Sequence, residues 1–117
     1  MDHTATELRK GALDVLILKT LSWGPAHGYA ISRWIREITE GILDIQEGAL
    51  YPALHRMEEK GWIESEWGMS DTKRRVKSYR MTPVGRRKLQ EEASSWTRFA
   101  RAMAKVLTTT GVPEGAR

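Results

Sequence analysis

The chain has 117 residues, enough for one compact domain and one additional long element. Its composition, 40% hydrophobic and 29% charged, supports a core and argues against a disordered chain. It has no cysteine, which excludes disulfides and thiolate metal sites and is typical of a reducing cytoplasm, the location we expect. We expect no secretory signal at the acid-containing N-terminus, and the longest apolar run, residues 15–18, is too short for a membrane span.

The net charge of +4 is unevenly distributed along the chain. Residues 41–71 contain seven acids and two bases, whereas residues 72–90 contain eight bases and no acid. A local basic cluster suits a polyanion, either nucleic acid or an anionic membrane surface. A solvated loop is the alternative that this pattern leaves open.

Three segments in the first half of the chain have helical patterns. Residues 8–21 are apolar on nearly every side, which predicts a first helix at the centre of the core. After the helix-breaking Gly24 and Pro25, a second helix is predicted from about Gly28 to Gly41 and a third from about Glu47 to Lys60. The side chains expected to face inward from these two helices are Ile31, Trp34, Ile35, Ile38, Leu50, Leu54 and Met57.

The pattern then changes to the two-residue period of strands. Residues 62–68 and 76–81 alternate in polarity, and the turn-rich segment between them predicts a hairpin loop. Thr82 and Pro83 are typical of the N-cap and first residue of a helix, which we expect to continue to about Thr110. This helix carries apolar or small residues at alternating steps of four and three, a heptad seam formed by Leu89, Ala93, Trp96, Ala100, Met103 and Leu107.

This order of elements predicts a mainly α fold with a small β-hairpin. It matches a winged helix-turn-helix domain over residues 1–82, followed by a long C-terminal dimerisation helix over residues 83–110 and a frayed tail over residues 111–117. In this architecture the third helix enters the major groove of DNA and the hairpin is a wing beside it. The basic cluster would then lie on the tip and return strand of the wing, facing phosphates or the minor groove.

Three motifs in this order resemble the PadR family of bacterial transcriptional regulators. They are His-Gly-Tyr at residues 27–29, Gly-x-Leu-Tyr-Pro-x-Leu at residues 48–54 and Tyr-x-x-Thr-x-x-Gly at residues 79–85. The similarity covers roughly residues 8–107, and the single C-terminal helix resembles the short-tailed branch of the family. The resemblance implies a homodimer built on the last helix, which binds an inverted repeat in or near a promoter, usually as a repressor.

Candidate DNA contacts lie on the second and third helices. Gly48 permits close backbone approach at a helix N-terminus, where free amides favour a phosphate. The resemblance implies contacts from Tyr51 and Tyr29, and a half-buried core aromatic is the alternative for Tyr29. His55 lies opposite the apolar face of the third helix and can reach base edges or phosphates. Because this helix offers few strong base readers, part of the specificity should come from DNA shape.

The basic segment supplies the strongest candidates for phosphate contact. These are Lys73, Arg74 and Arg75 at the hairpin loop, with Lys77 and Arg80 on the return strand as secondary contacts. For Lys73, Arg74 and Arg75 a solvated loop is the alternative.

Two other basic groups are weaker candidates. The resemblance extends backbone contacts to Arg9 and Lys10 at the start of the first helix, where a solvated helix end is the alternative. Arg86, Arg87 and Lys88 open the last helix, the end that the helix dipole makes unfavourable for cations. Proximity to a polyanion would offset that cost, and solvation is again the alternative.

The heptad seam predicts the dimer interface, with Trp96 near its middle. Some short-tailed members of the family hold flat aromatic drugs between paired tryptophans at the dimer centre. The resemblance therefore makes Trp96 a candidate ligand-binding residue and a small aromatic molecule a candidate effector. A packed interface anchor is the alternative interpretation of Trp96.

Enzymatic and metal-binding functions find no support in the sequence. His3, His27 and His55 lie on separate predicted elements without carboxylate or cysteine partners at ligand spacing, and we expect no metal and no cofactor. No glycine-rich phosphate loop or nucleophile elbow occurs. The expected partners are double-stranded DNA and a second copy of the chain, with no membrane. The alternative from another class is a winged-helix scaffold for protein interaction or dimerisation without specific DNA binding.

Overall fold

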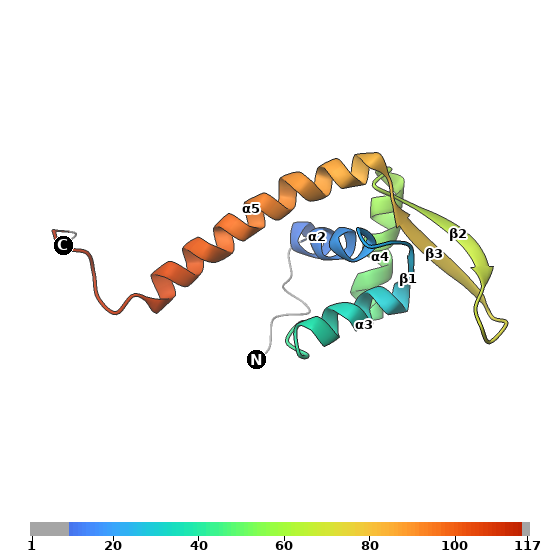
Figure 1. The fold of residues 1–117 in the computed structure, drawn as a ribbon, viewed down its shortest axis with the longest axis horizontal. Coiled ribbons are helices and arrows are strands. Elements are labelled where there is room, and N and C mark those ends of the chain that lie inside the picture. Colours follow the sequence, from blue (N-terminus) through green and yellow to red (C-terminus); the bar gives the residue numbers. More distant parts are fainter. Residues whose placement is uncertain (1–9, 116–117) are drawn as a thin grey trace.

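The computed structural model describes residues 10–115, which form four helices and a three-stranded antiparallel sheet (Figure 1). The elements in chain order are α2 (Lys10–Leu21), β1 (Ala26–His27), α3 (Gly28–Ile38), α4 (Glu47–Glu59), β2 (Ile63–Met69), β3 (Arg75–Met81) and α5 (Pro83–Thr108). The predicted mainly α fold, a winged helix-turn-helix followed by a long C-terminal helix, is confirmed.

The core lies where α2, α3 and α4 pack together under the sheet. Helix α2 occupies the middle of this arrangement, with α5 on one side and α3 and α4 on the other (Figure 1). This position explains why α2 is apolar on most of its surface, since most of its sides meet another element. The largest fully buried side chains are Ile17, Leu18, Ile31, Ile35, Leu50, Leu54, Met57 and Ile63.

The sheet differs from the predicted hairpin by one strand. Strands β2 and β3 pair from Ile63 with Met81 to Met69 with Arg75, which is the expected hairpin. The additional strand β1 has two residues, Ala26 and His27, and pairs with β3. The strand is too short to produce an alternating pattern, so periodicity did not predict it.

The prediction that Ile38 faces inward is wrong. Its side chain is 65% exposed at the end of α3, whereas Ile31 and Ile35 on the same helix are buried. Helical spacing identifies a face of a helix but does not say where the neighbouring elements along that face stop.

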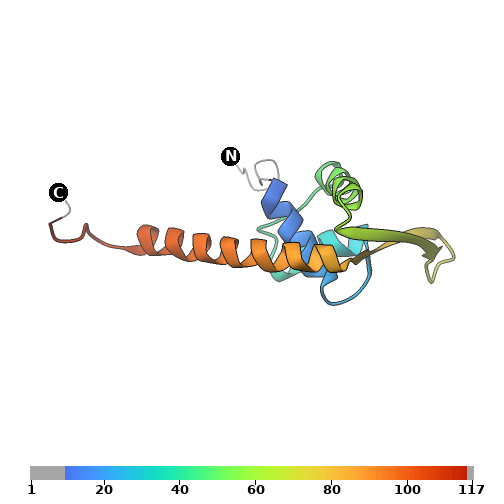
Figure 2. The same cartoon turned by 90° about the horizontal axis from the view of Figure 1, so that it is seen from above.

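Helix α5 leaves the domain through a tightly packed joint. The Thr82 hydroxyl accepts a hydrogen bond from the Gly85 amide at 3.0 Å and donates one to the carbonyl oxygen of Gly61 at 2.6 Å. The Thr82 amide donates to the Trp62 carbonyl oxygen at 3.0 Å. A Cβ atom on Gly85 would collide with that same oxygen, so only glycine fits there. Beyond the joint, α5 projects away from the domain on the side opposite the hairpin (Figure 2).

Candidate nucleic-acid interface

The hairpin of β2 and β3 has two chemically different faces. Alternation along the strands places Trp67 and Met69 on one face, opposite Lys77 and Arg75 respectively. The same face continues inward to the buried Ile63 and so packs against the core at its base. The exposed outer half of this face therefore combines apolar surface with positive charge. We call this half the aromatic face of the wing.

The second face of the hairpin is acidic. It carries Glu64 opposite Arg80 and Glu66 opposite Ser78. The Arg80 guanidinium donates to one oxygen of Glu64 at 2.7 and 3.0 Å, and this hydrogen bond raises the pKa of Arg80. Arg80 thus lies on the opposite face from Lys77, already paired with a carboxylate. It is a poor phosphate ligand in this position.

The loop of the hairpin presents the predicted cations to solvent. Lys73, Arg74 and Arg75 are all exposed, and Lys73 has a positive φ of 61°. The Ser70 side chain accepts a hydrogen bond from the Arg74 amide at 3.1 Å, and the Ser70 amide donates to the Arg74 carbonyl at 2.8 Å. These bonds close the turn that carries the three basic residues.

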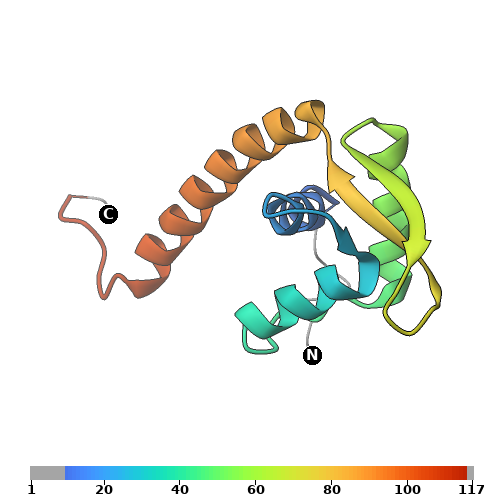
Figure 3. The same cartoon turned by 45° about the vertical axis from the view of Figure 1, so that its right-hand side comes forward.

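The N-terminal ends of α3 and α4 lie beside the base of the aromatic face (Figure 3). Tyr29 is 58% exposed and Tyr51 is 41% exposed, so neither belongs to the core. The Tyr51 ring packs against Gly28, where any Cβ atom would approach it to 2.8 Å. The glycine between His27 and Tyr29 therefore lets the tyrosine of α4 lie close to the start of α3.

A cleft of about 410 Å³ separates these helix ends from the wing. Its aromatic and polar lining residues include His27, Tyr29, Tyr51, Trp67, Lys77 and Tyr79. Sequence reasoning predicted three of these six as DNA contacts, Tyr29, Tyr51 and Lys77. It placed Trp67 on the hairpin but did not assign it to the site, because the pairing register that brings Trp67 opposite Lys77 follows only from the structure.

The remaining predicted contacts on α4 are solvent-facing. Gly48 lies in the first turn and has open space around its Cα, and His55 is exposed about two turns further along. The His55 Nε2 atom lies 3.6 Å from a carboxylate oxygen of Glu59. Arg86 and Arg87 at the start of α5 are exposed as well. Arg9 and the side chain of Lys10 lie outside the described residues.

The predicted seam on α5 has two parts, one inside the domain and one beyond it. Leu89 is buried in the core of its own chain, and Ala93 packs against that core. Trp96 is half-buried, and the seam is exposed from Ala100 onward, with Met103 45% exposed and Leu107 74% exposed. Two more apolar residues that heptad spacing had not included, Phe99 and Val106, widen this stripe.

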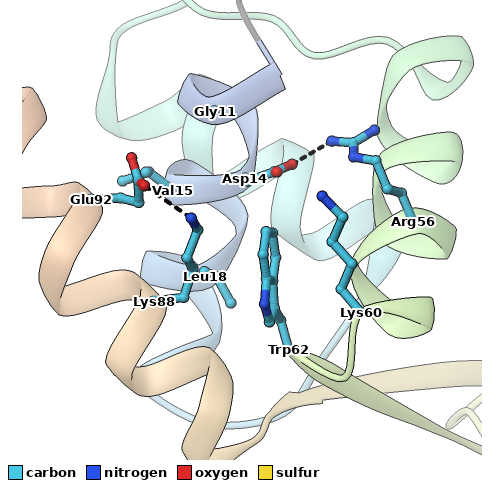
Figure 4. A pocket seen from close by; sticks show the side chains of 9 residues that line it. All are labelled: Gly11, Asp14, Val15, Leu18, Arg56, Lys60, Trp62, Lys88 and Glu92. Atoms are coloured by element: carbon cyan, nitrogen blue, oxygen red, sulfur yellow. Dashed lines mark hydrogen bonds and ion pairs between the residues drawn. The ribbon is translucent and has the colours of Figure 1, made fainter.

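A charged junction joins α2, α4 and α5 on another side of the domain (Figure 4). The buried Asp14 carboxylate accepts a hydrogen bond from Arg56 of α4 at 2.5 Å, and Lys88 of α5 pairs with Glu92 at 3.0 Å. The Trp62 ring lies between two ammonium groups, with Lys60 Nζ at 4.8 Å and Lys88 Nζ at 5.0 Å from its centroid. The junction therefore connects the third helix of the helix-turn-helix to the base of α5.

Burial raises the pKa of the Asp14 carboxyl above its ordinary value of 3.8, and the adjacent Arg56 charge only partly offsets this effect. The folded protein therefore holds the Asp14 proton more tightly than the unfolded chain does. The stabilisation from this proton is fully present below pH 3.8 and is lost as the pH rises through the raised pKa.

We expect Asp14→Asn to abolish this pH dependence, because the amide does not titrate. Urea unfolding between pH 3 and pH 7 measures it as the difference in unfolding free energy between the two proteins. Relative to the variant, the unsubstituted protein should be most stable at the acid end. A difference that is constant with pH, or that grows toward pH 7, would contradict the assignment.

Other kinds of site are not evident in the part of the chain that the structure describes. Among residues 10–115, no cluster of three or more histidine, aspartate or glutamate side chains could hold a metal ion. None of the helices in the same range is both long and apolar enough to cross a membrane.

Comparison with known proteins agrees with the geometry. Residues 17–91 match the model of the PadR-like family of transcriptional regulators. The chain is 32% identical to the transcriptional regulator Rv3488 of Mycobacterium tuberculosis over 96 residues, covering 81% of this chain and 85% of that protein. A transcriptional regulator from Clostridium thermocellum has a similar structure, with a TM-score of 0.72, 35% identity and coverage of 82% of this chain and 93% of that one.

A PadR family transcriptional regulator from Eggerthella lenta is also similar in structure. Its TM-score is 0.71 at 35% identity, and the match covers 89% of this chain and 88% of that one. The family model spans more than half of the chain and includes the helix-turn-helix, the wing and the joint to α5. The chain belongs to the PadR-like family and is a DNA-binding transcriptional regulator.

Proposed function

We propose that this protein is a sequence-specific repressor that binds an inverted-repeat operator as a homodimer. Residues 1–82 are the DNA-binding unit, residues 83–110 are the dimerisation helix and residues 111–117 are a tail. In this proposal α4 enters the major groove, and the wing tip contacts phosphates at the adjacent minor groove.

The observation that carries the proposal is the position of the wing relative to the helix-turn-helix. The exposed Tyr29 and Tyr51 line one cleft together with Lys77, between the wing and the starts of α3 and α4. The three exposed tip cations lie further out on the same wing. Hydroxyl groups and helix N-termini are common phosphate ligands, and exposed cations displace counterions from the duplex. We retain Tyr29, Gly48, Tyr51, His55, Lys73, Arg74, Arg75 and Lys77 as proposed DNA contacts. We leave out Arg80, because it is paired with Glu64 on the other face.

The exposed stripe on α5 supports a homodimer. The exposed residues Phe99, Met103, Val106 and Leu107 belong to the C-terminal half of α5. This half projects beyond the domain (Figure 2), so an isolated chain leaves the stripe in water. A second copy with its α5 antiparallel or crossed would cover the same stripe on both chains, as two-fold symmetry requires. We therefore assign Trp96, Ala100, Met103 and Leu107 to the proposed interface, with Ala93 at its edge.

Genome-wide footprinting of the protein, followed by titration of the recovered duplex and of a scrambled duplex at several salt concentrations, tests this function. The recovered site should be an inverted repeat, bound by two chains at least 10³-fold more tightly than the scrambled duplex. Absence of footprints, together with absence of salt-sensitive retention on duplex DNA, would favour a winged-helix scaffold for protein interaction.

A cavity of about 340 Å³ supports an effector site at the proposed interface. It lies between α2 and α5 and is lined by Gly11, Glu92, Ser95, Trp96 and Phe99. The Trp96 and Phe99 rings meet edge to face, with centroids 6.0 Å apart. The indole surface and the nearby Glu92 carboxylate suit a planar aromatic cation.

We expect planar cationic dyes to quench the fluorescence of Trp96 at micromolar concentrations and to weaken operator binding. Because binding linkage is reciprocal, the operator must weaken dye binding by the same factor. Titration of a variant that retains Trp96 as its only tryptophan measures the first effect, and repetition with bound operator measures the second. Unchanged emission with several dyes would indicate that Trp96 only packs the interface.

A further inference from the structure

Neutralising phosphates does not account for the aromatic face of the wing. Trp67 is 54% exposed and Met69, nearer the tip, is 69% exposed. Both side chains lie on the face that forms core at its inner end, yet they extend past it into solvent. Phosphate contacts need only the cations of the tip, so the apolar surface beside them calls for a different partner group.

Two cations lie over the Trp67 ring. The Arg75 guanidinium carbon is 4.6 Å from the ring centroid, and Lys77 Nζ is 5.7 Å from it. These contacts hold two cations close to an exposed indole. An apolar surface with positive charge beside it suits a ligand that combines apolar surface with nearby anionic groups. A groove of duplex DNA has this character, with sugars and base edges on its floor and phosphates along both rims.

The orientation of this surface is fixed by the rest of the molecule. Across the cleft from Trp67 are the exposed rings of Tyr29 and Tyr51, and the opposite face of the hairpin carries Glu64 and Glu66. The acidic face repels phosphates, whereas the aromatic face lies on the same side as the helix ends. A duplex held by α4 would therefore meet the wing through Trp67 and its two cations.

We propose that Trp67, supported by Met69, makes an apolar contact with deoxyriboses and base edges in the minor groove that the wing enters. An apolar side chain inserted there widens the groove and partly unstacks the adjacent base step. The cost depends on the deformability of that step, so the wing selects DNA sequences at positions where it makes no hydrogen bond to a base. This inference rests on the proposed DNA-binding mode and assigns to the wing a role in specificity.

The test compares Trp67→Ala and Trp67→Phe with the unsubstituted protein on the operator and on a scrambled duplex of equal length. Trp23→Ala is the matched control, because Trp23 is also exposed, at 62%, but lies in the turn between α2 and β1. Affinities are measured at several salt concentrations, and thermal unfolding and dimer mass confirm that each variant is folded alike.

We expect Trp67→Ala to lower operator affinity by at least about tenfold, from two lost aromatic contacts per dimer. Its affinity for the scrambled duplex should fall less than about threefold, and its slope of log affinity against log salt should stay within about one unit. Trp67→Phe should recover most of the affinity, and Trp23→Ala should change nothing. In a further duplex, the pyrimidine–purine steps under the wing are replaced by stiffer steps. This replacement should lower the affinity of the unsubstituted protein more than it lowers the affinity of Trp67→Ala.

A second measurement is independent of any loss of affinity. Operator binding should change the tryptophan emission of the unsubstituted protein, and most of that change should be absent in Trp67→Phe. Three results would overturn the inference while leaving DNA binding intact. The first is an equal loss of affinity by Trp67→Ala on both duplexes, and the second is a flattened salt slope in that variant. The third is an emission change that persists in Trp67→Phe. If the unsubstituted protein shows no salt-dependent binding to any duplex, the proposed function itself fails.

Discussion

Replacement of Arg74 and Arg75 by glutamine is expected to flatten the salt dependence of DNA binding by roughly three to four units of slope. The three tip cations contribute six charges per dimer, and with a few further contacts about 6–8 phosphates would be neutralised, giving a slope of about −5 to −7. The double substitution removes four of these charges. Glutamine retains much of the aliphatic stem of Arg75 next to Trp67, so the measured change reports charge more than packing.

The loss of affinity should be similar for the operator and for a scrambled duplex, because phosphate contacts position the protein without reading sequence. Arg98→Gln with Arg101→Gln is the control, since it removes the same charge from exposed positions of α5. The control should keep nearly the full slope. If the two double variants behave alike, the net charge of the chain and not the wing determines affinity, and the proposed docking of the wing is wrong.

Substitution of Met103 and Leu107 by lysine is expected to convert the protein into a monomer with little operator affinity. The two side chains are 45% and 74% exposed in the isolated chain, so the change should not unfold the domain. In a dimer it would place four ammonium groups in an apolar interface, where unpaired charges are costly. Solution scattering and titration of the operator measure the mass and the affinity. A monomer loses the benefit of two linked half-sites, typically a factor of 10² or more.

The matched control is Ser94→Lys with Ala102→Lys. It adds the same charge to α5, and heptad spacing places both residues away from the seam. This variant should keep the dimer mass and the operator affinity. A dimer of unchanged mass for Met103→Lys with Leu107→Lys would show that the exposed stripe is not the interface.

Leu89 shows the limit of heptad spacing as a predictor of the dimer interface. The pattern predicts one apolar side of α5, but it does not distinguish a seam that meets α2 of the same chain from one that meets a partner. In the structure Leu89 belongs to the core of its own chain, so a lysine there would destabilise the fold before it affected assembly. The two parts of the seam, one packed in the core and one exposed, meet at the point where α5 leaves the domain. This point is known only from the structure.

The helices and the hairpin were predictable because their patterns are long. The period of 3.6 residues placed α3 and α4 correctly, and the change to a period of two residues predicted β2 and β3. The two-residue β1 strand gave no such signal. Arg80 was assigned with the other bases because composition counts charges, whereas strand alternation and the pair with Glu64 place it on the opposite face. Trp67 was missed because its significance depends on its neighbours across the strands.

The packed joint at Thr82 and Gly85 has a consequence for the evolution of the binding site. In the proposed dimer the joint fixes the angle at which each α5 leaves its domain. The distance between the two wings and their relative rotation are therefore fixed as well. A base change within one half-site costs about 1–3 kcal/mol. Insertion of one base pair between half-sites turns one of them by about 34° around the duplex and disrupts all of its contacts together. The operators of this protein should therefore differ in the base sequence of their half-sites, while the number of base pairs between the half-sites stays constant.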